Sequence, residues 1–275
     1  NTSINSAKYI QSKITFAESE TFLYPEEFDN FLERSNNFDL VVPAIHGHPA
    51  EDGYLQSILD QRNIKYIFSN SSVSKLCFHK ENAKTKVSEI GYRVPRTYLF
   101  DDDINFPIIV KPQENGSSFG VFLVTTKDEL GQLSLESGEY LFEEYIEGRE
   151  LVVGVIENDN GIHALPVMEA KKSGAIFSEE EKTTELSKNI EIFPDILDLD
   201  LENKLKNTAC DIHQQIGLHH LSRTDFIVTN QGEIYFIEIN TIPGCSENSF
   251  IPKMLEKQKI NFSDLLQEWI KKELT

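Results

Sequence analysis

The chain has 275 residues, and its acidic residues clearly outnumber its basic ones. It contains 45 Asp and Glu against 26 Lys and Arg, which gives a formal net charge of −19. Such a surface repels phosphate backbones and anionic lipids, so we expect neither nucleic acids nor membrane surfaces as partners. With 39% hydrophobic and 26% charged residues the composition is typical of a globular protein, and no apolar run approaches the ~18 residues of a membrane span.

The three cysteines, Cys77, Cys210 and Cys245, lie at spacings that suit neither a disulfide framework nor a zinc site. Reduced thiols in a cytoplasmic protein fit this usage best. The first residues show no basic start followed by an apolar stretch, so a signal peptide is not indicated. Because the chain opens at Asn1 without an initiator Met, we expect its natural N-terminus to lie further upstream.

The first third of the chain predicts a small parallel α/β layer. An apolar run at 39–46 that ends in polar residues indicates a buried parallel strand leading into a loop, and 65–68 indicates a second strand. A helix capped by Ser71 or Ser72 should then run to its stop at Gly91.

In the rest of the chain, short apolar runs follow one another closely, which favours antiparallel sheet over βαβ alternation. The expected strands are 106–110, 121–125, 140–146, 150–156, 162–167, 223–228 and 234–238. Helices are expected at 201–216, ended by Gly217, and from a Ser263 cap to Lys272. The polar segment 171–189 has little periodicity, and a loop of this length is typical of an active-site lid.

The strongest chemical signal is a pair of strands near the C-terminus. Arg223 and Asp225 are two residues apart on one expected strand, and Glu238 and Asn240 are two apart on the next. Residues with this spacing share a face of a strand, so each pair should point the same way. The oxygens of Asp225, Glu238 and Asn240 suit Mg²⁺ that carries substrate phosphates. The alternative is a solvent-facing polar side, but the apolar neighbours indicate a buried strand in which unpaired carboxylates are costly.

A second signal is a lysine that a strand delivers into a Gly/Ser loop. Lys111 follows an apolar strand, and a few residues later come Gly116, Ser117, Ser118 and Gly120. Glycines let backbone amides approach a phosphate, hydroxyl groups donate to its oxygens, and the lysine supplies charge. The Walker A order is absent, so the segment predicts a different phosphate-binding loop, with a plain turn as the alternative.

Taken in chain order, the motifs of this sequence resemble those of the D-alanine–D-alanine ligases of the ATP-grasp superfamily over nearly the whole chain. The matching positions are 46–47, 51–56, Lys80, 110–112, 116–118, Glu143, Glu150, Arg223, Asp225 and 238–244. The resemblance implies an α/β (α+β) ATP-grasp fold of three domains, with ATP between two mostly antiparallel sheets. The domains would be 1–69, a partial parallel α/β substrate layer; 70–146, a central ATP-grasp part; and 147–275, a catalytic part with a lid at 171–189. The family's first strand and glycine-rich turn would precede Asn1.

The same resemblance assigns roles to single residues. Those expected to contact ATP are Lys80, Lys111, Ser117, Ser118, Glu143, Glu144, Ile146 and Glu150. Those expected to hold a pair of Mg²⁺ ions, or Mn²⁺ in their place, are Asp225, Glu238 and Asn240. The expected catalytic groups are Arg223, the backbone N–H of Gly244, Ser117 and Lys182. The expected substrate contacts are His46, Glu51, Ser249 and Phe250.

The implied reaction is the ADP-forming ligation of two D-alanines to D-alanyl-D-alanine through an acyl phosphate, in the cytoplasm and for peptidoglycan synthesis. The family commonly forms homodimers, so the resemblance implies one here. Thr183 stands beside Lys182 where the family has an aromatic residue, usually Tyr. This departure leaves a different second substrate, another amino acid or D-lactate, as an alternative. The alternative from another class is a non-catalytic ATP-binding regulator. Loss of Lys111, Arg223, Asp225 or Glu238 would favour it, but all four residues are present.

Overall fold

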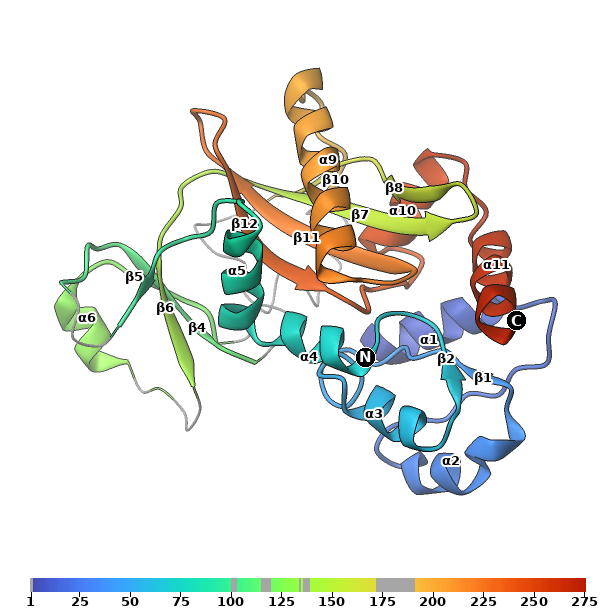
Figure 1. Ribbon diagram of the computed structural model, residues 1–275. Coiled ribbons are helices and arrows are strands. Elements are labelled where there is room, and N and C mark those ends of the chain that lie inside the picture. Colours follow the sequence, from blue (N-terminus) through green and yellow to red (C-terminus); the bar gives the residue numbers. More distant parts are fainter. Residues whose placement is uncertain (1, 100–102, 115–119, 134, 136–138, 172–190) are drawn as a thin grey trace.

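The computed structural model describes residues 2–99, 103–114, 120–133, 135, 139–171 and 191–275. Within these ranges the chain forms a small parallel sheet near the N-terminus, a sheet of four strands and a sheet of six strands. Figure 1 shows the four-stranded sheet at one end of the molecule, the six-stranded sheet in the middle, and the N-terminal helices below it in this view. All described strand pairs of the two larger sheets are antiparallel, as the close spacing predicted.

The N-terminal part pairs a short parallel sheet with several helices. The helices are α1 (Thr2–Lys13), α2 (Phe28–Arg34), the 3₁₀ helix η1 (Ser35–Asn37) and α3 (Tyr54–Gln61), and the strands are β1 (Leu40–Val41) and β2 (Lys65–Tyr66). The predicted parallel pairing is confirmed. The strand expected at 39–46 is much shorter, because β2 offers only two residues to pair with. Helix α1 was not predicted, since it buries only Ser6 and Ile10 and its apolar face is too narrow to show a period.

The single helix expected before Gly91 is wrong, because the helix is broken in two. α4 (Ser71–Phe78) and α5 (Lys80–Glu89) are separated by His79, whose ψ of 105° is not helical. The His79 imidazole accepts a hydrogen bond from a backbone N–H in the first turn of α5 and so caps it. The break makes Lys80 the first residue of α5, and its N–H donates to the carbonyl oxygen of Gln113, just after β4. This contact ties the start of α5 to the neighbouring sheet.

Asparagines cap two of the helices in place of the serines that were expected. Asn70 caps α4, where one of the two following serines was expected, and accepts a hydrogen bond of 3.0 Å from a first-turn N–H. Asn261 caps α11 (Phe262–Leu274), where Ser263 was expected. Among the helices that the structure describes, none is long and apolar enough to span a membrane.

The four-stranded sheet places two charged residues on one face. In the described part of this sheet the order is β3, β6, β4, β5, with bounds β3 (Thr97–Tyr98), β4 (Ile108–Pro112), β5 (Phe122–Val124) and β6 (Tyr140–Glu144), and α6 (Lys127–Gln132) packs beside β5. Ile108 and Val110 enter a small core on one face. Alternation along the strands then turns Lys111 and Glu143 to the other face. Because Ile109 is paired with Glu143, these two charged residues are diagonal neighbours.

The six-stranded sheet holds most of the remaining strands. Its described order is β10, β9, β7, β11, β12, with β8 paired to β7. The bounds are β7 (Arg149–Asn158), β8 (Gly161–Ala164), β9 (Met168–Ala170), β10 (Glu191–Ile192), β11 (Leu221–Val228) and β12 (Ile234–Asn240). The single strand expected at 162–167 is wrong, because β8 and β9 are separate strands that pair with different parts of β7. Nearly all of the lid expected at 171–189 lies outside the described residues.

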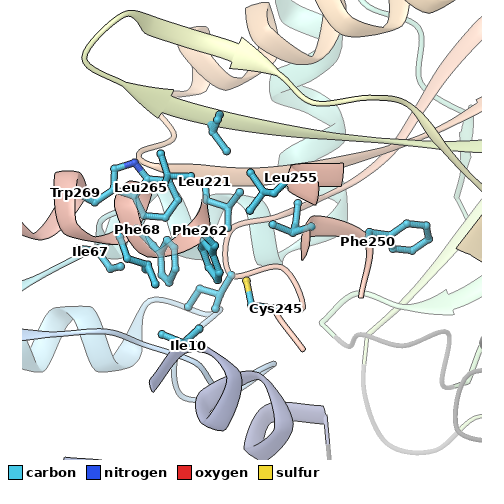
Figure 2. Packing of buried hydrophobic residues seen from close by; sticks show 14 of the residues in the cluster. Ile10, Ile67, Phe68, Leu221, Cys245, Phe250, Leu255, Phe262, Leu265 and Trp269 are labelled. Atoms are coloured by element: carbon cyan, nitrogen blue, oxygen red, sulfur yellow. The ribbon is translucent and has the colours of Figure 1, made fainter. Parts of the chain in front are cut away.

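Strand β7 is buried on both faces of this sheet. Its odd-numbered residues, Leu151, Val153 and Val155, pack beneath α9 (Leu199–Ile216), which ends at Gly217 as expected. Its even-numbered residues, such as Val152 and Ile156, join the core formed by α10 (Phe250–Lys257), α11 and the N-terminal part. Figure 2 shows this second core, in which Phe262, Leu265 and Trp269 of α11 lie around Phe68. The N-terminal part is therefore held to the large sheet through a shared apolar core.

Candidate active site

Two neighbouring strands carry the predicted cluster of polar residues. In the register of β11 and β12, Arg223 lies opposite Asn240, and Asp225 lies opposite Glu238. The guanidinium of Arg223 donates from Nε and Nη2 to the two carboxylate oxygens of Asp225, both at 2.8 Å. Its Nη2 also lies 3.8 Å from Oε1 of Glu238, to which the Asn240 amide donates at 3.5 Å. The prediction that Arg223 and Asp225 share a face is confirmed.

The electrostatics of this cluster fit a divalent cation. Burial raises the pKa of Asp225 to about 7. Arg223 lowers this pKa, and the nearby carboxylates of Glu238 and Glu150 raise it. The cluster thus gathers more carboxylate charge than Arg223 neutralises. The described part of the chain has no group of three or more His, Cys, Asp or Glu suited to a metal. The fit therefore rests on the carboxylates of Asp225 and Glu238 and the amide oxygen of Asn240, which are hard oxygen ligands.

A buried ion pair with two lysines lies on the four-stranded sheet. Lys111 Nζ is 2.6 Å from Oε2 of Glu143, and Lys84 Nζ is 2.5 Å from its Oε1. All three side chains are at most 7% exposed, and Lys84 also donates to the Thr97 hydroxyl at 2.9 Å. Burial alone would raise the pKa of Glu143, but Lys111 and Lys84 outweigh it and hold the pKa below its usual value. An adenine contact by Glu143 stays a prediction, and here both of its oxygens face lysines.

Lys84 was missed by the sequence analysis. The one signal that could have found it is its position four residues after Lys80, which places both on the same side of α5. Lys80 is itself buried. The pKa of Lys80 is lowered, chiefly by burial. The carboxylate of Glu238 opposes this shift, and the positive charge of Lys111 adds to it. Helix α5 packs against β12, and Lys84 of α5 and Lys111 of β4 both pair with Glu143, so these elements bring their charged groups into one site.

The residues expected at the first-substrate end also lie together. Glu51 accepts a hydrogen bond of 2.6 Å from the Gly47 N–H, and its Oε1 lies 3.7 Å from Nδ1 of His46. Helix α1 borders this group, because Ser3 Oγ accepts from the His46 N–H at 3.1 Å and Ser6 Oγ lies 3.4 Å from His46 Nε2. The two serines were missed along with the helix, although their spacing of three would place them on one helical face.

The segment after β12 closes the other side of the cluster. A Cβ atom on Gly244 would lie 3.2 Å from the Ser249 hydroxyl, so these two residues are in close approach. The Ser249 hydroxyl also lies 2.6 Å from that of Ser246. The Arg223 guanidinium stacks over the Phe250 ring, at 5.4 Å from its centroid. The structure therefore brings the predicted oxyanion and second-substrate residues together beside Arg223.

The other residues expected to contact ATP lie in different surroundings. Glu144 pairs with the backbone of Arg96, from whose N–H its side chain accepts at 3.3 Å, and Ile146 is buried. Glu150 lies on β7 close enough to Asp225 to raise the pKa of that carboxyl. The predictions for Ser117, Ser118 and Lys182 fall outside the described residues.

Comparison with known proteins shows the family of the chain. A family model described as "D-ala D-ala ligase C-terminus" matches residues 80–271. The chain belongs to the D-alanine–D-alanine ligase family. It is 31% identical over 259 residues to the D-alanine–D-alanine ligase of Thermotoga petrophila, with 91% of this chain and 84% of that protein covered. It is 33% identical over 261 residues to that of Christiangramia forsetii, with 88% and 79% covered.

Solved ligase structures have the same fold. The D-alanine–D-alanine ligase of Bacillus anthracis complexed with ATP matches with a TM-score of 0.78 at 24% identity, over 99% of this chain and 92% of that one. VanG D-Ala:D-Ser ligase of Enterococcus faecalis matches with a TM-score of 0.74 at 30% identity, over 86% and 73%. The expected ATP-grasp fold is thereby confirmed, and the chain is an ATP-dependent ligase of this family.

Proposed function

We propose that the protein joins two D-alanines to D-alanyl-D-alanine, with ATP converted to ADP and phosphate, for peptidoglycan synthesis. The observation that carries the proposal is the cluster of Arg223, Asp225, Glu238 and Asn240 on adjacent strands of a chain of this ligase family. With ATP as a substrate, we expect the reaction in the cytoplasm. We also expect a homodimer.

The reaction needs a better leaving group than a carboxylate offers. Transfer of the γ-phosphoryl group of ATP to the carboxylate of the first D-alanine gives an acyl phosphate. The amine of the second D-alanine then attacks the acyl carbon, the new C–N bond forms, and the C–O bond to phosphate breaks as the amine loses a proton. Phosphoryl transfer depends chiefly on positioning and on neutralising charge. Lys80 and Lys111 would supply positive charge to the phosphates from two elements, α5 and β4.

Metal ions fit the same scheme. Mg²⁺ ions, or Mn²⁺ in their place, would be held by Asp225, Glu238 and Asn240 and would neutralise phosphate oxygens. The bidentate pair with Asp225 fixes the plane of the Arg223 guanidinium before substrate binds. Arg223 and the backbone N–H of Gly244 would then donate to the oxyanion of the tetrahedral intermediate. A donor of this kind is worth roughly 2.7–4 kcal/mol in the transition state.

A different second substrate is the alternative that a specific observation favours. VanG, whose name specifies D-Ala and D-Ser, is 30% identical to this chain. The two ligations share the acyl phosphate and differ only in the nucleophilic amino acid. Phe250 beneath Arg223, together with Ser249, would border the second substrate and influence that choice.

The test is to detect the product by mass spectrometry. The full-length protein is incubated with ATP, Mg²⁺ and a panel of amino acids led by D-alanine, alone and in pairs with D-serine and D-lactate. We expect D-alanyl-D-alanine from the wild type, and its loss in Glu238→Ala. The matched control is Glu233→Ala, because Glu233 precedes the same strand but pairs with exposed Arg93 at the surface.

Each outcome has a clear meaning. A mixed product formed with D-serine or D-lactate would keep the mechanism and replace the second substrate. Bound ATP without turnover under any condition would reject the ligase proposal and favour the regulator.

A further inference from the structure

Ser6 of α1 bridges two segments of the proposed active site. It is only 2% exposed. Its hydroxyl oxygen accepts a hydrogen bond from the N–H of Cys245 at 3.1 Å and lies 3.4 Å from Nε2 of His46. Cys245 directly follows Gly244, the predicted oxyanion donor, and is 239 positions away from Ser6 along the chain. Figure 2 shows Cys245 in the same apolar core as Ile10, one turn further along α1.

The hydrogen-bonding capacity of a hydroxyl group lets Ser6 serve both partners at once. A serine hydroxyl has one hydrogen to donate and can accept through its lone pairs. The Cys245 N–H uses one lone pair of the oxygen, so the hydroxyl can contact His46 Nε2 through its hydrogen or through its second lone pair. On the other side of the ring, Nδ1 of His46 faces the Glu51 carboxylate at 3.7 Å. Ser6 therefore joins Cys245 to His46, and His46 in turn faces Glu51.

Helix α1 also fixes the backbone of His46. Ser3 lies one turn before Ser6 and accepts from the His46 N–H at 3.1 Å. The helix thus holds both the main chain and the ring of His46, while the same face holds the segment after β12.

The Cys245 N–H belongs to the peptide unit that follows Gly244. Because a peptide unit is planar, holding this N–H fixes the whole unit, and only the φ and ψ of Gly244 separate it from the Gly244 N–H. Ser249 closes in on Gly244 from the other side, and the Cys245 thiol donates to the carbonyl oxygen of Pro243 at 3.2 Å. The orientation of the oxyanion donor thus depends on a contact made by the N-terminal helix.

We propose that Ser6 is a positioning residue of the ligase, which sets the oxyanion loop 243–245 relative to His46. The inference rests on the proposed function, in which Gly244 and His46 serve the same reaction. It goes beyond that function by giving α1 a part in catalysis without contact to a reacting atom. Loss of the hydroxyl would leave the buried Cys245 N–H without this acceptor and would let the loop shift.

The kinetic test compares Ser6→Ala, Ser6→Thr and a matched control. Ser35→Ala is that control, because Ser35 is fully buried and its hydroxyl also has two partners, neither of them in the proposed site: it donates to the carbonyl oxygen of Leu32 and accepts from Arg62. We expect Ser6→Ala to lower kcat about tenfold, since a shift of an ångström can cost more than that. The KM for ATP should stay unchanged. Ser6→Thr, which keeps the hydroxyl, should restore most of the rate, and Ser35→Ala should leave it unaltered.

A second measurement reports on the bridge without catalysis. Hydrogen exchange of the peptide that contains Cys245 should be faster in Ser6→Ala than in the wild type, and unchanged in Ser35→Ala. Unchanged exchange in Ser6→Ala would show that the bridge does not hold the loop. Faster exchange with an unchanged kcat would show that the contact is only structural, and either result would overturn the inference. If the wild type forms no dipeptide, the proposed function fails, and the exchange data still decide whether Ser6 holds the loop.

Discussion

The ion pair of Lys84, Glu143 and Lys111 allows a prediction in which stability and ATP affinity are separated. Lys84→Met keeps most of the side-chain volume but removes one ammonium group. Removing one partner of a buried ion pair typically costs about 3–5 kcal/mol, but Lys111 remains beside Glu143, so we expect a loss of about 2 kcal/mol in the free energy of unfolding. Glu143→Gln should destabilise at least as much, because two buried ammonium groups then face each other without a carboxylate.

The two variants should change ATP affinity in opposite directions. With two lysines and one glutamate the group carries a net charge of +1, which Lys84→Met reduces to zero and Glu143→Gln increases to +2. A change of one unit charge near the phosphates should alter the free energy of ATP binding by about 1 kcal/mol, or about fivefold in Kd, at the screening expected beside a protein surface. Weaker ATP binding is therefore expected in Lys84→Met. Equal or tighter binding is expected in Glu143→Gln, because the amide oxygen of Gln can still accept a hydrogen bond from an adenine amino group.

Denaturant unfolding and isothermal titration with ATP would measure these quantities. Lys86→Met is the matched control, because Lys86 lies on the same helix but is 40% exposed and pairs with Glu89 at the surface. It should change neither quantity appreciably. The reasoning would be refuted if Lys84→Met were no less stable than Lys86→Met, or if the two buried substitutions shifted the Kd for ATP in the same direction.

Other predictions concern pH and the backbone. Because the pKa of Glu143 is lower in the folded than in the unfolded chain, its contribution is complete above about pH 5 and is lost as the pH falls through the folded value; the wild type should lose stability below about pH 5 more steeply than Glu143→Gln in urea titrations. Gly53→Ala should cost roughly 3 kcal/mol or more in the same assay, since Gly53 has φ +80° and a Cβ would lie 2.2 Å from the Ser71 carbonyl oxygen. Asn70→Ala removes the cap of α4 and should lower the free energy of unfolding by about 1 kcal/mol, whereas Asn70→Asp should keep most of it.

Local patterns in the sequence predicted part of this site, and tertiary contacts determined the rest. Alternation along a strand is a local rule, so the spacing of Arg223 and Asp225 was enough to place them on one face. No glycine or proline marks the break at His79 in the sequence. The break is accompanied by a hydrogen bond from the Lys80 N–H to the carbonyl oxygen of Gln113, which lies far away in the sequence. Lys84 became part of the site only because β6 brings Glu143 against it.

The N-terminal helix shows the same limit from another side. Helix α1 is mostly polar and buries only Ser6 and Ile10, so its buried face cannot be recognised from a hydrophobic period. The partners that make this face meaningful, such as Cys245 and Phe262, come from the far end of the chain. The local pattern of twelve residues contains no information on partners so distant in the sequence. The helix and its two serines were therefore both missed.

The double burial of β7 determines how the molecule should come apart on heating. Because one strand supplies side chains to the layer under α9 and to the layer under α11, neither layer can melt while the other stays intact. Among the residues that the structure describes, the sheet of β3 to β6 has a separate, smaller core around Ile108 and Val110, into which β7 sends no side chain. Calorimetry should therefore show an early transition for that sheet and a later, cooperative one for everything attached to β7.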